Sequence, residues 1–221
     1  MLKAALSPSL MCADIFSLGD TLKAFGENGI EYLHIDVMDG VFVPNFCLGT
    51  DFCRRVRAHT QIPFDIHLMV TEPEKKLDFF DILREDIVSV HYESTSRPDE
   101  ALKRIRERGA KPFLALNPDT PVNTAKDFIP LIDGVLLMTV YPGFAGQKMV
   151  PGSLEKLKSM RLLLDENGGE KLRIEVDGNV NFEKAPLMRR SGADMFVSGS
   201  SGVFRPGCIA ENISSLRALL V

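Results

Sequence analysis

The most informative absences in this 221-residue chain concern charge and long apolar runs. Lys and Arg number 26 against 30 Asp and Glu, so the net charge is −4 and no basic excess exists to attract nucleic acid or a membrane surface. The longest apolar runs fall far short of the roughly 20 residues that a membrane span needs. Residues 1–5 (MLKAA) lack the charged and apolar regions of a signal peptide. We therefore expect a cytoplasmic protein that binds neither nucleic acid nor membranes.

Cysteine is scarce and carries no motif. The four cysteines, Cys12, Cys47, Cys53 and Cys208, show no CxxC spacing. In a chain without an export signal we expect reduced thiols. Cys12 follows the first expected strand and could be a nucleophile, but no base is at hand in the sequence. We therefore interpret it as a small packed residue.

The motifs of several enzyme classes are also missing. The chain has no G-x-G-x-x-G and no Walker A sequence, which argues against a dinucleotide or P-loop nucleotide site. It has no G-x-S-x-G nucleophile elbow. No Lys lies in the C-terminal half of an expected strand, so a Schiff-base aldolase is disfavoured. The H-x-H pattern found on the first strand of many metallohydrolase barrels is absent too.

What the sequence does contain is a regular alternation of short β-rich segments with amphipathic ones. The expected strands are residues 5–10, 32–38, 64–70, 87–91, 112–116, 134–140, 173–176 and 195–197. Apolar residues recur at three- and four-residue spacing in the stretches 17–28, 73–80, 98–108, 121–128, 153–166 and 183–191. Eight strand-and-helix units without a composition break predict a single α/β domain over residues 1–221, a (β/α)8 TIM barrel. The rival is a doubly wound open sheet, which usually needs fewer strands.

Polar residues fall toward the carboxyl ends of the expected strands, the rim that carries the chemistry of barrel enzymes. They are Ser9, His34, Asp36, His67, His91, Asn117 and Asp177. His34 and Asp36 lie two apart, so their side chains share one face of a strand. Together with His67 and Asp177 they predict a metal site, and imidazole with carboxylate suits Zn, Fe(II), Mn or Co. The alternative is buried, hydrogen-bonded histidines with Asp residues that cap loops; His91 has no obvious partner and is expected to support a ligand or to pack.

Two glycine-rich segments follow late strands. Residues 141–147 (YPGFAGQ) follow the sixth strand and residues 197–202 (VSGSSG) follow the eighth. Either segment alone is an ordinary turn, but two on neighbouring strands favour backbone N–H donors to a phosphate. Met38, Met69 and Met138 lie at or beside strand ends. They are core residues or an apolar wall around reacting carbons.

The remaining chemistry is proton transfer. A metal beside two acidic residues on different strands, Asp36 and Asp177, suits moving a proton next to a carbonyl while the metal stabilises the enediolate.

These motifs together resemble the ribulose-phosphate 3-epimerase family over nearly the whole chain. The matching segments are residues 7–9 (SPS), 34–40 (HIDVMDG), 42–45 (FVPN), 67–69 (HLM), 117–118 (NP), 138–140 (MTV), 142–144 (PGF) and 175–178 (EVDG). The resemblance implies a metal-dependent (β/α)8 barrel that inverts C3 of a ketose phosphate. It also implies a homo-oligomer, either a dimer or a hexamer.

The resemblance assigns roles to individual residues. His34, Asp36, His67 and Asp177 would bind one divalent ion, whether Zn, Fe(II), Mn, Co or Mg. Asp36 and Asp177 would also be the acid/base pair on opposite faces of the substrate. Ser9 and His67 would contact the sugar. The other substrate-binding residues would be Gly143, Phe144, Ala145, Gly146, Asp177, Gly178, Asn179, Gly199, Ser200 and Ser201.

The chain departs from the family pattern at three positions, and two of its segments resemble one branch of the family. Ala145 stands where the family commonly has Gly, Asn179 replaces a second Gly after the catalytic Asp-Gly, and Val41 replaces a common His. Residues 10–12 (LMC) and 200–204 (SSGVF) look more like the allulose-6-phosphate 3-epimerase branch. We therefore expect interconversion of D-allulose 6-phosphate and D-fructose 6-phosphate. The alternative is epimerisation of D-ribulose 5-phosphate to D-xylulose 5-phosphate; a phosphosugar lyase or decarboxylase, or a non-catalytic sensor, is less favoured.

Overall fold

The computed structural model describes residues 2–221, so Met1, the first residue of the expected domain, lies outside the described residues. Nine strands form one sheet in the order β1-β9-β8-β7-β6-β5-β4-β2-β3. Eight of them are parallel: β1 (Ala5–Pro8), β2 (Leu33–Asp39), β4 (Phe64–Met69), β5 (Ile87–His91), β6 (Lys111–Leu116), β7 (Gly134–Met138), β8 (Arg173–Asp177) and β9 (Met195–Ser198). The ninth, β3 (Phe46–Cys47), is a two-residue antiparallel addition to β2.

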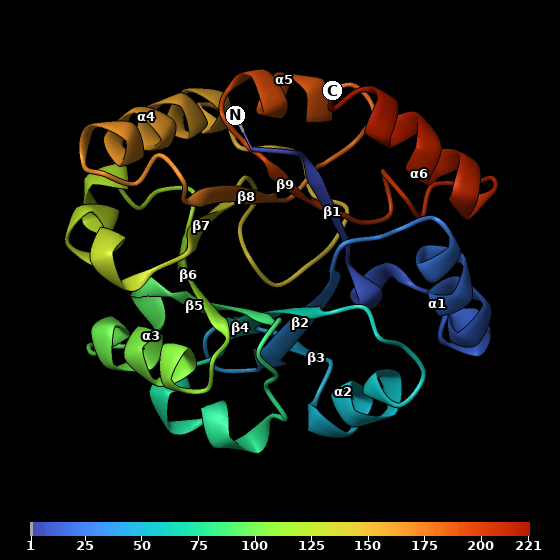
Figure 1. Ribbon diagram of the computed structural model, residues 1–221, viewed down its shortest axis with the longest axis horizontal. Coiled ribbons are helices and arrows are strands. Elements are labelled where there is room, and N and C mark those ends of the chain that lie inside the picture. Colours follow the sequence, from blue (N-terminus) through green and yellow to red (C-terminus); the bar gives the residue numbers. More distant parts are fainter. Residues whose placement is uncertain (1) are drawn as a thin grey trace.

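The two ends of the parallel series meet between β1 and β2. Ser9 and His34 form a parallel bridge there, and the Tyr32 N–H donates to the Leu6 carbonyl at 3.4 Å. Figure 1 shows the resulting ring of strands with helices around its outside. The barrel predicted from the alternation is confirmed, and the open doubly wound sheet is excluded.

Within residues 2–221, six α-helices lie outside the ring (Figure 1): α1 (Leu18–Glu27), α2 (Thr50–Arg57), α3 (Pro98–Glu107), α4 (Ser153–Glu166), α5 (Ala185–Arg190) and α6 (Ile209–Ala218). Two stretches expected to be α-helical are 3-10 turns instead: η3 (Pro73–Lys75) with η4 (Leu77–Phe79), and η6 (Val122–Leu131). Pro130 lies inside η6, and a proline there removes a backbone donor. Helices α2 and α6 were not among the expected amphipathic stretches; α2 buries only Cys53 and Val56, so it has few apolar residues to reveal it.

Alternation along the strands sorts side chains into an outer and an inner set. In β2, Leu33, Ile35 and Val37 belong to the main apolar cluster, whereas His34 and Asp36 belong to the polar inner set. Inside the barrel, a separate apolar cluster of Ala5, Ile87, Phe113 and Met195 lies near the start of the strands. The polar residues follow it toward the carboxyl ends. The barrel interior is thus a packed apolar base that supports a buried polar site.

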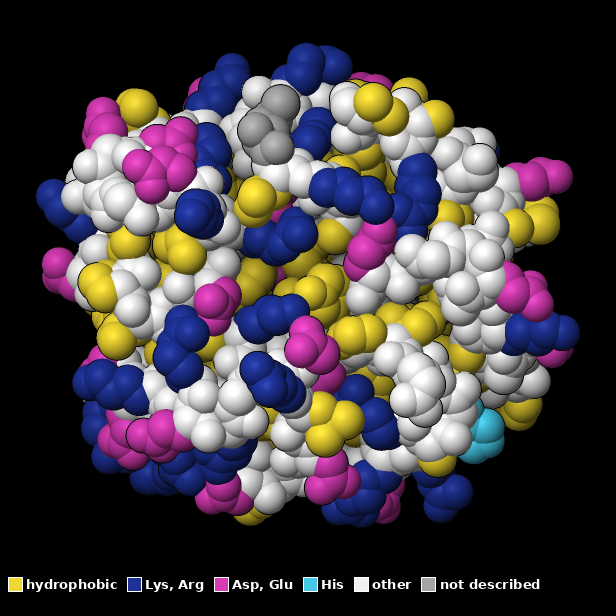
Figure 2. Space-filling model, viewed as in Figure 1, with side chains coloured by type: hydrophobic (Ala, Val, Ile, Leu, Met, Phe, Trp, Pro, Cys, Tyr) yellow, Lys and Arg dark blue, Asp and Glu magenta, His cyan; other side chains and the backbone are white. Residues whose placement is uncertain are grey.

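The exterior carries both signs of charge. Figure 2 shows Lys and Arg side chains interspersed with Asp and Glu on the face it presents, with one histidine at its edge. The other histidines, His34, His67 and His91, are fully buried. Within residues 2–221, no helix combines the length and the apolar character that crossing a bilayer requires.

Candidate active site and metal centre

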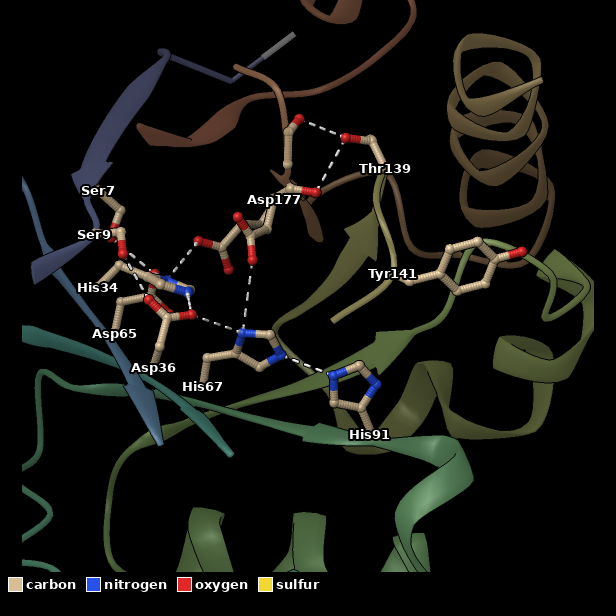
Figure 3. Close-up of polar contacts among 12 residues, drawn as sticks. Ser7, Ser9, His34, Asp36, Asp65, His67, His91, Thr139, Tyr141 and Asp177 are labelled. Carbon is tan, nitrogen blue, oxygen red and sulfur yellow. Dashed lines mark hydrogen bonds and ion pairs between the residues drawn. The ribbon is translucent and has the colours of Figure 1, made fainter. Parts of the chain in front are cut away.

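Four side chains converge inside the barrel from three strands. His34 and Asp36 come from β2, His67 from β4 and Asp177 from the last residue of β8. Each offers one ligand atom, and these four atoms all lie within 4.8 Å of one another. His34 Nε2 lies 3.4 Å from Asp36 Oδ1, and His67 Nδ1 lies 3.7 Å from Asp36 Oδ1 and 3.8 Å from Asp177 Oδ2. Figure 3 shows the four groups pointing toward one another.

His34 lies deeper than a strand-end residue. The expectation that it sits toward the carboxyl end of its strand is wrong, because β2 runs from Leu33 to Asp39 and His34 is its second residue. In the sheet register His34 is paired with Asp65, one layer below the pair Asp36 and His67. The imidazole spans this difference, because Nε2 at its far end reaches the Asp36 carboxylate.

The donor set fits a divalent ion. His34 Nε2 and His67 Nδ1 are buried and have no hydrogen-bond partner, which is costly for two polar atoms unless a ligand satisfies them. Metal–nitrogen and metal–oxygen bonds of about 2.0–2.2 Å place two ligands of one ion about 3 to 4.4 Å apart. The separations around Asp36 Oδ1 fall in this range. The arrangement therefore suits an ion that accepts both imidazole and carboxylate.

The opposite nitrogen of His34 is held by a carboxylate that the sequence reasoning missed. His34 Nδ1 lies 2.5 Å from Asp65 Oδ2, and the Ser7 hydroxyl donates to the same oxygen at 2.8 Å. Glu175 Oε1 is 3.9 Å from His34 Nδ1. Burial, reinforced by the Asp65 carboxylate, raises the pKa of Glu175 well above its usual range, which favours the neutral acid.

The opposite nitrogen of His67 is also occupied. His67 Nε2 lies 2.8 Å from His91 Nε2, and His91 Nδ1 lies 3.2 Å from Glu93 Oε2. His91, for which the sequence suggested no partner, thus contacts a candidate ligand directly (Figure 3). Burial lowers the pKa of His91 to about 4 despite the nearby Glu93 carboxylate, so His91 is neutral.

The two candidate acid/base carboxyl groups differ in charge. Burial raises the pKa of Asp177 to about 7; His34 opposes the shift and the Asp36 carboxylate adds to it. Burial also acts to raise the pKa of Asp36, but His34 and His67 outweigh it and hold that pKa well below the usual range. Asp36 is therefore an ionised acceptor near neutral pH, while Asp177 can carry a proton.

A pocket opens above this cluster. It brings together most of the sequence-predicted substrate residues: Ser9, Asp36, Gly143, Phe144, Ala145, Gly146, Asp177, Gly178, Asn179, Gly199, Ser200 and Ser201. Met38, Met69 and Met138 line it as well, joined by Met11, which the sequence reasoning did not single out. Cys12 is also in the lining. His67 is buried and lies outside the lining.

Backbone geometry shapes the two ends of this pocket. Gly178 has a φ of 109°, and a Cβ there would meet Val140 Cγ2 at 2.7 Å, so the close passage of the chain after Asp177 requires glycine. Asn179 has a φ of 52°, a conformation that Asn tolerates better than most residues. Its side-chain amide donates to the Gln147 carbonyl at 3.0 Å, which ties the loop after β8 to the loop after β7. Ser9 donates to Asp36 Oδ2 at 2.6 Å.

Known proteins resemble this chain along most of its length. A sequence model of the ribulose-phosphate 3 epimerase family matches residues 5–204. A ribulose-phosphate 3-epimerase of Bacillus subtilis (strain 168) is 43% identical over 201 residues, which cover 91% of this chain and 92% of the relative. The protein of the same name in Synechocystis sp. is 39% identical over 214 residues, covering 96% and 92% of the two chains.

Solved structures with low sequence identity share the fold. A 3-hexulose-6-phosphate synthase superimposes with a TM-score of 0.67 at 17% identity, over 100% of both chains. The orotidine 5'-phosphate decarboxylase of Pyrococcus horikoshii gives a TM-score of 0.66 at 15% identity, over 97% of this chain and 98% of the other. These likenesses concern the barrel alone.

Proposed function

Because the chain belongs to the ribulose-phosphate 3-epimerase family, and is therefore a carbohydrate epimerase, we propose that it inverts C3 of a ketose phosphate at the His34, Asp36, His67 and Asp177 cluster. The observation that carries this proposal is the convergence of two carboxyl groups with two unpartnered imidazole nitrogens at the base of the pocket. The carboxyl groups come from strands that are separated by β1 and β9, so they approach the pocket from different sides.

Asp36 and Asp177 divide the proton transfers. Asp36, which is ionised, accepts the proton as the C3–H bond breaks. The electron pair of that bond passes into the C2 carbonyl and forms an enediolate. Asp177, protonated, delivers a proton to C3 from the opposite face, and the configuration at C3 inverts. In the reverse direction the two groups exchange roles. The hydroxyl of Ser9 holds the Asp36 carboxylate in place through its hydrogen bond.

The cluster would hold one divalent ion through His34 Nε2, His67 Nδ1 and a carboxylate oxygen each from Asp36 and Asp177. A bound ion of this kind supplies Lewis-acid stabilisation of the enediolate oxygens. Met38, Met69 and Met138 form an apolar wall that keeps water from the reacting carbons. The backbone of residues 143–146 and 199–201 supplies N–H donors at the phosphate end.

We propose D-allulose 6-phosphate as the substrate, with D-ribulose 5-phosphate as the second candidate. The first choice rests on two branch-specific segments, residues 10–12 and 200–204, both of which contribute to the pocket through Met11, Cys12, Ser200 and Ser201. The second is favoured by the names of the relatives in Bacillus subtilis and Synechocystis. A lyase that forms a Schiff base is disfavoured, because the pocket in the described residues has no lysine in its lining.

The test follows the C3 proton by NMR in deuterated water, with each sugar phosphate in turn. We expect loss of the C3–H signal, its suppression by a chelator and its recovery on adding Zn²⁺. Asp36→Asn and Asp177→Asn should each slow exchange by about 10²–10⁴-fold, because each removes one proton carrier. Asp165→Asn, which neutralises an exposed carboxylate on α4, is the matched control and should exchange at the wild-type rate.

Two results would contradict the proposal at different levels. Full exchange in either single variant would overturn the two-base assignment. A kcat/KM at least tenfold higher for ribulose 5-phosphate, about 1.4 kcal/mol in the barrier, would overturn the choice of allulose 6-phosphate while leaving the epimerase intact.

A further inference from the structure

Three buried or half-buried groups form a chain of hydrogen bonds that leads away from the candidate metal site. His67 Nε2 meets His91 Nε2 at 2.8 Å, and His91 Nδ1 meets Glu93 Oε2 at 3.2 Å. His67 and His91 are fully buried, and the Glu93 side chain is 21% exposed. The His91 ring also packs on Phe42, with the ring centroids 4.8 Å apart. No step of the proposed reaction uses His91 or Glu93.

The chain of hydrogen bonds has a fixed direction, set by the carboxylate at its end. An ionised carboxylate only accepts hydrogen bonds, so the proton between Glu93 and His91 resides on His91 Nδ1. His91 is fully buried and packs on Phe42, surroundings that disfavour a charged ring, so its Nε2 presents a lone pair to His67. His67 must donate from Nε2, which leaves His67 Nδ1 without a proton. That unprotonated nitrogen is the one that faces Asp36 and Asp177.

Glu93 is itself held in one orientation. Its other oxygen, Oε1, accepts hydrogen bonds from the Asn117 backbone N–H at 2.9 Å and from the Thr120 hydroxyl. Burial acts to raise the pKa of Glu93, but the hydrogen bonds from His91 and Thr120 outweigh it and lower the pKa to about 2. The carboxylate is therefore ionised and cannot rotate without breaking two further hydrogen bonds.

We propose that Glu93 and His91 are positioning residues that fix the tautomer of His67, so that His67 Nδ1 is always free to bind a divalent ion. The inference rests on the proposed function, because it takes His67 as a ligand. Ligand histidines gain affinity when the second ring nitrogen donates to an acceptor of fixed orientation. Here that acceptor is a second histidine, whose own orientation is set by a carboxylate.

Glu93→Gln tests this proposal directly, because it is expected to reverse the direction of the hydrogen bonds between Glu93, His91 and His67. The amide oxygen is drawn to the side where Asn117 N–H and Thr120 O–H donate, so the amide NH₂ faces His91 Nδ1. A donor at that position forces the His91 proton onto Nε2, and His91 then donates to His67 Nε2. The His67 proton moves to Nδ1, where it blocks the metal site. One isosteric change thus reverses all hydrogen bonds in the chain.

The experiment measures ¹⁵N NMR couplings of the histidine rings in metal-free protein, together with Zn²⁺ affinity by chelator competition. In the wild type we expect protons on His67 Nε2 and His91 Nδ1. In Glu93→Gln we expect protons on His67 Nδ1 and His91 Nε2, and an affinity for Zn²⁺ lowered by about 10- to 100-fold. His91→Phe, which keeps the packing on Phe42, should also lower Zn²⁺ affinity by about tenfold.

Asp127→Asn is the matched control. Asp127 is exposed and lines the same surface groove as Glu93, so it loses the same charge without touching a histidine. In Asp127→Asn, the tautomers of His67 and His91 and the affinity for Zn²⁺ should match those of the wild type. A wild-type His67 protonated on Nδ1, or an unchanged Zn²⁺ affinity in either of the other two variants, would overturn the proposal. Failure of the epimerase proposal would be seen separately from failure of this one. The wild type would then show the expected tautomers of His67 and His91 but no exchange at C3.

Discussion

Each candidate ligand histidine has one nitrogen free and the other committed to an acceptor. His34 reaches its carboxylate, Asp65, directly, whereas His67 reaches Glu93 through His91. The direct contact fixes the proton on His34 Nδ1 and increases the basicity of Nε2. In both histidines the nitrogen that faces the cluster is therefore the one without another hydrogen-bond partner.

Asp65→Asn should weaken Zn²⁺ binding by about 10- to 100-fold, because the amide keeps the shape of the side chain but loses the charge that polarises His34. Chelator competition measures the change. Ser7→Ala is the matched control, since it removes the other hydrogen bond to the same Asp65 oxygen and leaves His34 in place. Equal affinities for Asp65→Asn and the wild type would show that Asp65 has no part in preparing His34.

Among the secondary-structure elements, one carboxylate joins several around the base of the barrel. Asp86, directly before β5, is 1% exposed and accepts two hydrogen bonds from Arg57 at the end of α2. It also accepts from the backbone N–H of Phe64, where β4 begins, and of Leu83. The Arg57 guanidinium lies 3.5 Å from the Phe64 ring centroid. This contact compensates for the few apolar residues that α2 buries.

Asp86→Asn should lower the free energy of unfolding by about 3 kcal/mol, because it leaves Arg57 without its buried partner. For a chain of this size that corresponds to a fall in Tm of roughly 6–12 °C. Calorimetry at pH 7 tests this. Asp81→Asn, which affects an exposed pair with Arg54, should change stability by less than about 0.5 kcal/mol. A similar loss of unfolding free energy in both variants would mean that the buried pair of Asp86 and Arg57 stabilises the fold no more than the exposed pair does.

The sequence predicted the elements that alternate most regularly and missed those that depend on neighbours. All eight parallel strands overlap their predicted ranges, since strands buried on both faces appear in the sequence as short, nearly continuous apolar runs. Asp65 and Glu175 lie two residues before His67 and Asp177, so strand alternation already placed them on the ligand face. Their role was missed because only the structure shows His34 between them. Glu93 lies beyond the end of β5, where alternation gives no information.

At the scale of the whole molecule, the site joins distant parts of the barrel. The four candidate ligands span residues 34–177 and come from three strands, so any ion they hold is bound by the folded chain and not by the unfolded one. Binding that is confined to the folded state stabilises the whole domain by mass action.

Adding Zn²⁺ at a hundred times its dissociation constant should therefore raise the free energy of unfolding by about 2.7 kcal/mol, or Tm by roughly 5–10 °C. A thermal scan with and without a chelator measures the shift. Ca²⁺, which prefers six to eight oxygen ligands, serves as the control ion and should give a smaller shift. Asp177→Asn should reduce the Zn²⁺ shift, and an undiminished shift in that variant would place the ion elsewhere.

β1 contacts β2 only at a narrow seam and depends on β9 for its full ladder, and this sets the order in which the ring of strands can be completed. Ser9 and His34 bridge that seam, and β1 makes its full ladder with β9, near the other end of the chain. During synthesis β1 emerges first and must wait for about 190 later residues before its partner strand exists. The ring therefore closes last between β1 and β9, next to Ser9 and the loop after β9 that line the pocket. A nascent or truncated chain that ends before β9 has no closed ring around these residues, so competence for catalysis comes only with the finished polypeptide.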